Sequence, residues 1–139
     1  MAKRKPKTPY QLSKKKCWDA FSRYIRLKYS DNGWCTCVTC PKKGWWTGDG
    51  FQAGHGISGR GNGVLFLEEV VRPQCFSCNS TQNNGMYNVY VPLLIEWYGQ
   101  DGYDEFMVIK NQSKKYTKEE LDDMRKEFDD FSEEKLKEI

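Results

Sequence analysis

The sequence lacks long apolar runs and has very little histidine. No stretch approaches the roughly 18 consecutive apolar residues that span a bilayer, so we expect no membrane segment. No apolar signal segment opens the chain either, and we therefore expect its six cysteines to stay reduced rather than to form disulfides. His55 is the only histidine, so any chemistry that requires an imidazole must use this residue.

Acidic residues are absent from the first 16 positions. The net charge of +3 for the whole chain does not reveal this uneven distribution. Residues 117–139, in contrast, carry ten acidic and five basic side chains. Clustered lysine and arginine bind nucleic-acid phosphates, whereas an acidic segment repels them. The sequence predicts DNA binding through Lys3, Arg4, Lys5, Lys7, Lys14, Lys15 and Lys16. A mobile, solubilising tail over residues 1–9 is the alternative.

Apolar periodicity predicts helices at both ends of the chain. Pro6 and Pro9 are expected to keep the first residues out of a helix, and a helical pattern then covers residues 11–29. Shorter helices are expected at 87–98 and 103–109, with a break at Gly99–Gly102 between them. A capping-box pattern at Thr117 predicts an amphipathic helix over 118–137. The glycine-rich stretch between these helical regions is typical of hairpins and loops.

Four of the six cysteines form two C-x-x-C pairs that are separated by 34 residues. Zinc binds four thiolates in a tetrahedron, and each pair can supply half of the ligands. The sequence therefore predicts a structural Zn²⁺ held by Cys37, Cys40, Cys75 and Cys78. Cys35 could substitute for one ligand, whereas Cys17 lies on the predicted first helix and is expected in the core. A site of three thiolates and His55 is the alternative.

The interval between the cysteine pairs contains His55, and Asn79 directly follows the second pair. If the four cysteines saturate the zinc, His55 is available for catalysis in its glycine-rich turn. His55 is then expected near the turn of the second C-x-x-C pair, which Asn79 follows. From the residues alone, a structural role for His55 stays open as the alternative.

The order of these motifs resembles the phage recombination protein NinG (Rap) family over roughly residues 18–130. The resemblance is carried by Cys37-x-x-Cys40, Gln52-Ala53-Gly54-His55, Gln74-Cys75-x-x-Cys78-Asn79 and the helix start Tyr116-Thr117-x-Glu119-Glu120-Leu121. More distantly, the chain resembles phage endonuclease VII, in which a zinc clasp supports a ββα-metal nuclease site. The combined order of the motifs is far more specific than any one of them.

The resemblance implies an α+β fold, with a small zinc-stapled ββα-metal core of the HNH (His-Me finger) type and flanking α-helices. On this basis we divide the chain into a basic flexible arm (1–10), an N-terminal helix (11–30), a nuclease core (31–90) and C-terminal helices (91–139). His55 matches the general base. Asn79 matches a ligand of the catalytic Mg²⁺ or Mn²⁺.

Further positions in the resemblance concern metal and DNA contacts. Glu68 matches a recurring acidic position and is a second candidate ligand, while Arg60 and Asn62 lie in the loop expected to contact DNA. Two positions depart from the pattern. Val70 stands where the family has an Asn that would orient the base, and Gln52 stands where some relatives have Asp.

The implied function is a metal-dependent, structure-specific endonuclease that resolves Holliday junctions in the cytoplasm of a bacterial host by general-base activation of water. An HNH nicking or restriction nuclease on duplex DNA, and a non-catalytic zinc-dependent DNA-binding module, are the alternatives. Resolution requires two nicks, so we expect a homodimer. Its expected contact is the apolar face of the last helix, formed by Leu121, Met124, Phe128 and Phe131.

Overall fold

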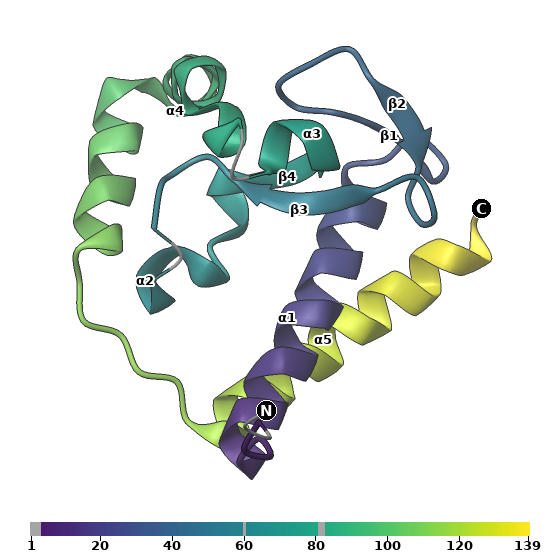
Figure 1. The fold of residues 1–139 in the computed structure, drawn as a ribbon, viewed down its shortest axis with the longest axis vertical. Helices are drawn as coiled ribbons and strands as arrows, with labels where there is room; N and C mark the ends of the chain where they lie inside the picture. The colour runs from purple at the N-terminus through teal and green to yellow at the C-terminus, as the bar shows by residue number, and fades with distance from the viewer. Residues whose placement is uncertain (1–3, 60, 81–82) are drawn as a thin grey trace.

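The computed structural model describes residues 4–59, 61–80 and 83–139. Within these residues the chain forms a small mixed α+β domain with five α-helices and two small antiparallel sheets (Figure 1). The elements in chain order are α1 (Pro9–Lys28), β1 (Trp34–Thr36), β2 (Lys43–Trp45), β3 (Phe51–His55), α2 (Asn62–Leu65), the 3₁₀ helix η1 (Glu68–Val70), β4 (Val71–Cys75), α3 (Phe76–Asn79), the 3₁₀ helix η2 (Asn84–Met86), α4 (Tyr87–Lys110) and α5 (Lys118–Lys137).

Helix α1 begins two residues earlier than the periodicity predicts. Thr8 caps it and forms a reciprocal capping box with Gln11, and Pro9 occupies the first helical turn. Proline is well suited to this position, because the amide hydrogen that it lacks would have no partner within the helix. The expectation that Pro9 stays outside the helix is therefore wrong, and residues 9 and 10 belong to α1 rather than to a flexible arm.

Helix α5 has the predicted bounds but a different role for its apolar face. Leu121 is fully buried, and the Phe128 ring lies 5.1 Å from that of Phe21 and 5.0 Å from that of Tyr24 on α1. Figure 1 shows α1 and α5 crossing side by side. Much of the face expected to mediate dimerisation is thus covered by α1 of the same chain, although Phe131 is 38% exposed.

The two sheets hold the middle of the chain. Strands β1 and β2 form one hairpin, and β3 pairs with β4 so that His55 lies opposite Val71. A long connection, residues 56–70, joins β3 to β4 and contains α2 and η1. Strand β4 continues directly into α3, so two paired strands are followed at once by a helix.

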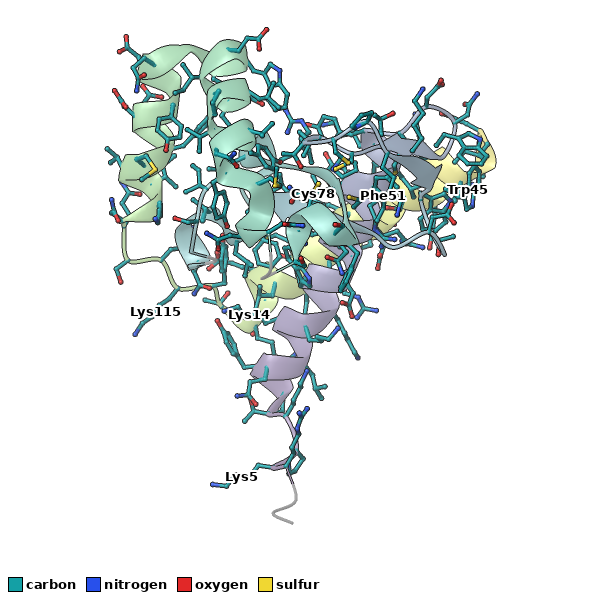
Figure 2. The ribbon with its side chains drawn as sticks, turned by 45° about the horizontal axis from the view of Figure 1, so that its top comes forward. Lys5, Lys14, Trp45, Phe51, Cys78 and Lys115 are labelled. Atoms are coloured by element: carbon teal, nitrogen blue, oxygen red, sulfur yellow. The ribbon has the colours of Figure 1, made fainter. Side chains whose placement is uncertain are left out.

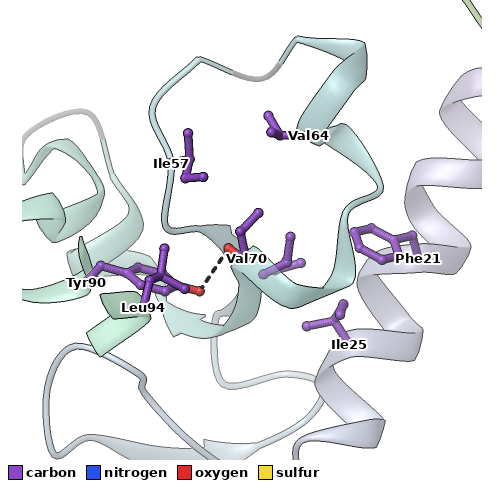
Figure 3. Packing of buried hydrophobic residues seen from close by; sticks show 9 residues of the cluster. Phe21, Ile25, Ile57, Val64, Val70, Tyr90 and Leu94 are labelled. Carbon is purple, nitrogen blue, oxygen red and sulfur yellow. Dashed lines mark hydrogen bonds between the residues drawn. The ribbon is translucent and has the colours of Figure 1, made fainter. Parts of the chain in front are cut away.

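The main core lies between α1, the β3–β4 pair and α4. Figure 3 shows its central residues, with Phe21 and Ile25 from α1 facing Val70 and Leu94. Helix α4 bends at Gly99, whose φ of 77° and ψ of 166° are not helical. The predicted break is therefore confirmed at Gly99 alone, because residues 100–102 are helical and α4 continues to Lys110. Among the described residues, no helix combines the length and the apolar character that a bilayer crossing requires.

Candidate active site and metal centre

Four cysteines meet where the β1–β2 hairpin approaches β4 and α3. The sulfur atoms of Cys37, Cys40, Cys75 and Cys78 all lie within 4.8 Å of one another, and none of the six cysteines forms a disulfide. The sulfurs of Cys40 and Cys75 are 3.7 Å apart. Tetrahedral zinc with Zn–S bonds of about 2.3 Å places its sulfurs about 3.8 Å apart. The predicted cluster is confirmed, and it can hold a metal ion such as zinc (Figure 2).

The surroundings of Cys37 differ from those of the two cysteines outside the cluster. Burial opposes ionisation of Cys37, but hydrogen bonds from the Cys75 amide and from Thr39 outweigh it and lower the pKa to about 7. Burial instead raises the pKa of Cys17 and of Cys35 to about 11. Cys35 donates its hydrogen to the carbonyl of Arg26 at 3.3 Å, so it lies outside the four-sulfur cluster.

His55 is the last residue of β3 and is only 5% exposed. Its Nε2 lies 3.0 Å from the carbonyl oxygen of Leu65. A carbonyl can only accept, so Nε2 carries the hydrogen and the lone pair of the neutral ring is on Nδ1. The ring also stacks on Trp18, with centroids 5.5 Å apart and planes at 15°. The carbonyl of Leu65 and the ring of Trp18 thus orient the imidazole, a role that the resemblance gave to an Asn at the position of Val70.

The glycines on either side of His55 are required by packing. A Cβ atom at Gly54 would lie 2.1 Å from Oε1 of the buried Gln74, and one at Gly56 would lie 2.6 Å from the ring of Tyr90. Such distances are far below van der Waals contact. The glycine-rich turn therefore allows Gln74 and Tyr90 to press against the backbone around His55.

Asn79 ends α3 and faces the same pocket as His55. Its Nδ2 donates to Oε1 of Gln52 at 2.7 Å, which leaves the carboxamide oxygen of Asn79 as the atom able to bind a cation. The pocket has a volume of about 270 Å³. It is lined by Ala53, His55, Asn79, Ser80, Asn84, Gly85 and Tyr87. The structure thus brings together the two residues that the sequence singled out, and adds Ser80 and Asn84 as oxygen donors that the sequence analysis missed.

A family model described as "Bacteriophage Lambda NinG protein" matches residues 2–138. The chain belongs to the NinG family. Searches of the curated proteins and of the solved structures found no match. The NinG match covers the cysteine cluster, the pocket of His55 and both terminal helices, so the family resemblance stated from the motifs is confirmed.

Glu68 lies outside this pocket in the NinG chain. Its carboxylate accepts hydrogen bonds from Tyr24, from Lys28 at 2.6 Å and from Tyr29 at 3.1 Å, all at the C-terminal end of α1. Burial would raise the pKa of Glu68, but the donors Lys28 and Tyr24 outweigh it and hold the pKa below its ordinary value. The carboxylate thus links η1 to α1, and the structure does not bring it to Asn79.

The remaining candidate residues lie before α1, along α1 and at the start of α2. Asn62 accepts a hydrogen bond from Nζ of Lys14 at 2.8 Å and donates to the Lys114 carbonyl, so both of its polar groups bind within the chain. Lys15 pairs with Asp19 at the surface. The other predicted DNA contacts within the described residues are exposed, namely Arg4, Lys5, Lys7 and Lys16. Lys3 and Arg60 lie outside the described residues.

Proposed function

We propose that this NinG protein is a metal-dependent endonuclease of the HNH type that cleaves branched DNA inside a bacterial host cell. One observation carries the proposal: β3, β4 and α3 place His55 and Asn79 in a single pocket, beside a cysteine cluster able to hold zinc. Two antiparallel strands followed by a helix are the order of elements in a ββα-metal core. Because α3 is short, this unit needs support from outside, and the neighbouring zinc site supplies it.

In this proposal His55 acts as the general base. Nδ1 takes a proton from water, the water oxygen attacks the scissile phosphorus, and the bond to the 3′ oxygen breaks. The 3′ oxygen then takes a proton from solvent, so the products carry a 5′-phosphate and a 3′-hydroxyl. Because Nε2 is held by Leu65, the ring can accept this proton without turning.

The oxygen atoms of the pocket can also serve as ligands of a divalent cation. Mg²⁺ or Mn²⁺ prefers oxygen ligands, and Mg²⁺ commonly takes one or two from protein while keeping waters and substrate phosphates. Asn79, Ser80 and Asn84 supply neutral oxygens, and the described lining includes no carboxylate. When bound, the ion would stabilise the charge of the phosphate and of the departing oxygen. We therefore propose that Asn79 and the DNA phosphate jointly bind the divalent cation.

The substrate is tested by incubating the purified protein and Mg²⁺ with a four-way junction and with linear duplexes of the same sequence. We expect paired nicks on opposing strands of the junction and little cleavage of the duplex. Such nicks need two sites related by two-fold symmetry, so light scattering of the junction complex should give two protomers. Equal cleavage of junction and duplex would favour a plain HNH nickase, and a strict monomer making uncoupled nicks would contradict the resolvase.

A second candidate function follows from the absence of a carboxylate among the described pocket residues. Gln52 occupies a position where some relatives have Asp, and Glu68 is bound elsewhere. These features favour a zinc-dependent DNA-binding module without catalysis. A plasmid assay with Mg²⁺ and with Mn²⁺ distinguishes the two, because only the endonuclease converts supercoiled DNA to nicked or linear forms.

Replacing Asn79 with alanine should strongly reduce cleavage, because the pocket loses its proposed cation ligand. The loss should shrink at high Mg²⁺ or with Mn²⁺, since a weakened cation site can be filled by mass action. The measurement is the cleavage rate as a function of metal concentration. Gln52→Ala is the matched control variant. It removes the hydrogen-bond partner of Asn79 but keeps the carboxamide oxygen of Asn79, the proposed cation ligand. Equal metal dependence of Asn79→Ala and the parent would argue against the ligand role.

A further inference from the structure

Two hollows on the surface follow one side of α1, and the pocket of His55 adjoins them. The first, of about 520 Å³, is lined by Lys7, Gln11, Lys14, Lys15, Trp18 and Leu65. The second, of about 370 Å³, is lined by Trp18, Ser22, Arg26, Phe51, Gln52, Ala53 and Asn79. Trp18 belongs to both, and Ala53 and Asn79 also line the pocket of His55. The hollows therefore adjoin one another between the N-terminal end of α1 and the candidate active site, and we treat them together as one groove.

The spacing of the residues from α1 shows that they form a single stripe. Gln11, Lys15, Trp18, Ser22 and Arg26 follow one another at intervals of three or four residues, and side chains at these intervals share one helix face. Trp18 stands where the stripe passes His55, on which it stacks. One face of α1 therefore forms a continuous wall of the groove.

The charge of this face differs from that of the face that meets α5. Lys7, Lys14 and Lys15 border the outer hollow, and Arg26 borders the inner one beside Asn79. Among the described residues, one ion pair involves these side chains: Lys15 pairs with Asp19 at the exposed surface, where ion pairs contribute little. A polyanion can displace such a partner.

Lys16 lies next to Lys15 in the sequence but on another side of the helix. It borders hollows that it shares with Asp19, Asp122 and Asp129, two of them from α5. The basic neighbours in these hollows, Arg23, Lys118 and Arg125, form ion pairs with Asp129 or Asp122, so the charges of this face are largely compensated within the chain. The basic segment is thus divided by the fold into a groove side and an α5 side, a division that the sequence does not reveal.

We propose that one DNA strand lies in this groove along α1, with its phosphates on Lys7 and Lys15, and reaches the scissile position beside Asn79. The inference rests on the proposed endonuclease function and specifies how that substrate is held. The positive charge of the groove lysines complements a nucleic-acid backbone, which we therefore take as the occupant. Because the groove adjoins the His55 pocket, the strand runs along α1 toward that pocket.

The test compares two double variants that remove the same charge. K7Q/K15Q removes lysines of the groove, whereas K16Q/K126Q removes Lys16 and the exposed Lys126 of α5, which line none of the hollows of the groove. Both are made in the His55→Ala protein, so that a labelled four-way junction stays intact while its binding is followed by fluorescence anisotropy between low and moderate salt. The same pairs in the otherwise unchanged protein are assayed for cleavage, and thermal melting confirms that each variant is folded.

We expect K7Q/K15Q to weaken binding by about tenfold and to reduce the slope of log K against log salt by roughly 1.4 to 1.8, since each phosphate contact contributes about 0.7 to 0.9. K16Q/K126Q should stay close to the parent. Equal weakening by both pairs, or by neither, would overturn the groove while a cleaving parent keeps the endonuclease proposal intact. A parent that neither binds nor cleaves DNA would overturn both.

Discussion

Replacing His55 with alanine is expected to abolish cleavage while leaving the affinity for a four-way junction nearly unchanged. A general base acts on the transition state and contributes little to ground-state binding. Loss of a positioned base lowers rates by about 10²- to 10⁴-fold, and the chain contains no second histidine to replace it. The measurement is the single-turnover cleavage rate beside the junction dissociation constant.

The alanine variant also removes the hydrogen bond to the buried Leu65 carbonyl and the stack on Trp18, so it needs a second variant as control. His55→Gln keeps an amide hydrogen that can reach Leu65 but supplies no base. An unpaired buried carbonyl costs about 1–3 kcal/mol, so His55→Ala should melt below the parent and His55→Gln less so. Both should be inactive. Substantial cleavage by a folded His55→Gln protein would place the base elsewhere.

The sequence predicted those features that depend on local chemistry. The spacing of Cys37/Cys40 and Cys75/Cys78 predicted their cluster, because each knuckle turns its two thiols to one side within four residues. The capping box at Thr117 set the start of α5, and Gly99 marked the bend of α4. In each case a few neighbouring residues determine the geometry, so one sequence is sufficient.

Features that depend on the path of residues 56–70 could not be predicted in this way. The Leu65 carbonyl reaches His55 only because the chain returns to the end of β3 at the last residue of α2, and a backbone carbonyl leaves no signal in the sequence. The charge of Glu68 is evident from the sequence, but its partners are not, because Tyr24 and Lys28 lie on α1, far away in the sequence. The basic segment was identified from composition alone, whereas its division between Lys15 and Lys16 required the position of α5.

Loss of the four-cysteine metal site is expected to unfold the core, which is the largest effect on stability that the structure predicts. The two small sheets and the short α3 meet at this cluster, and the cysteines form a core cluster of their own with Phe51. Zinc binding in small domains contributes about 10–16 kcal/mol to folding, whereas whole domains are stable by about 5–15 kcal/mol. The metal contribution therefore equals or exceeds the net stability. We expect one zinc per chain, and unfolding by Cys75→Ser or by a strong chelator.

Cys35→Ser is the matched control for this prediction. Cys35 is as buried as Cys75 and lies beside the cluster, but its sulfur bonds to the Arg26 carbonyl, and a serine hydroxyl can donate the same bond. This variant should keep one zinc and lose only about 1–2 kcal/mol, a typical effect of one buried substitution. Metal analysis and thermal melting are measured on both variants. Loss of zinc from Cys35→Ser, or a Cys75→Ser protein that melts like the parent, would show that the metal is bound by a different set of ligands. The support of α3 and of Asn79 would then have to come from the apolar core alone.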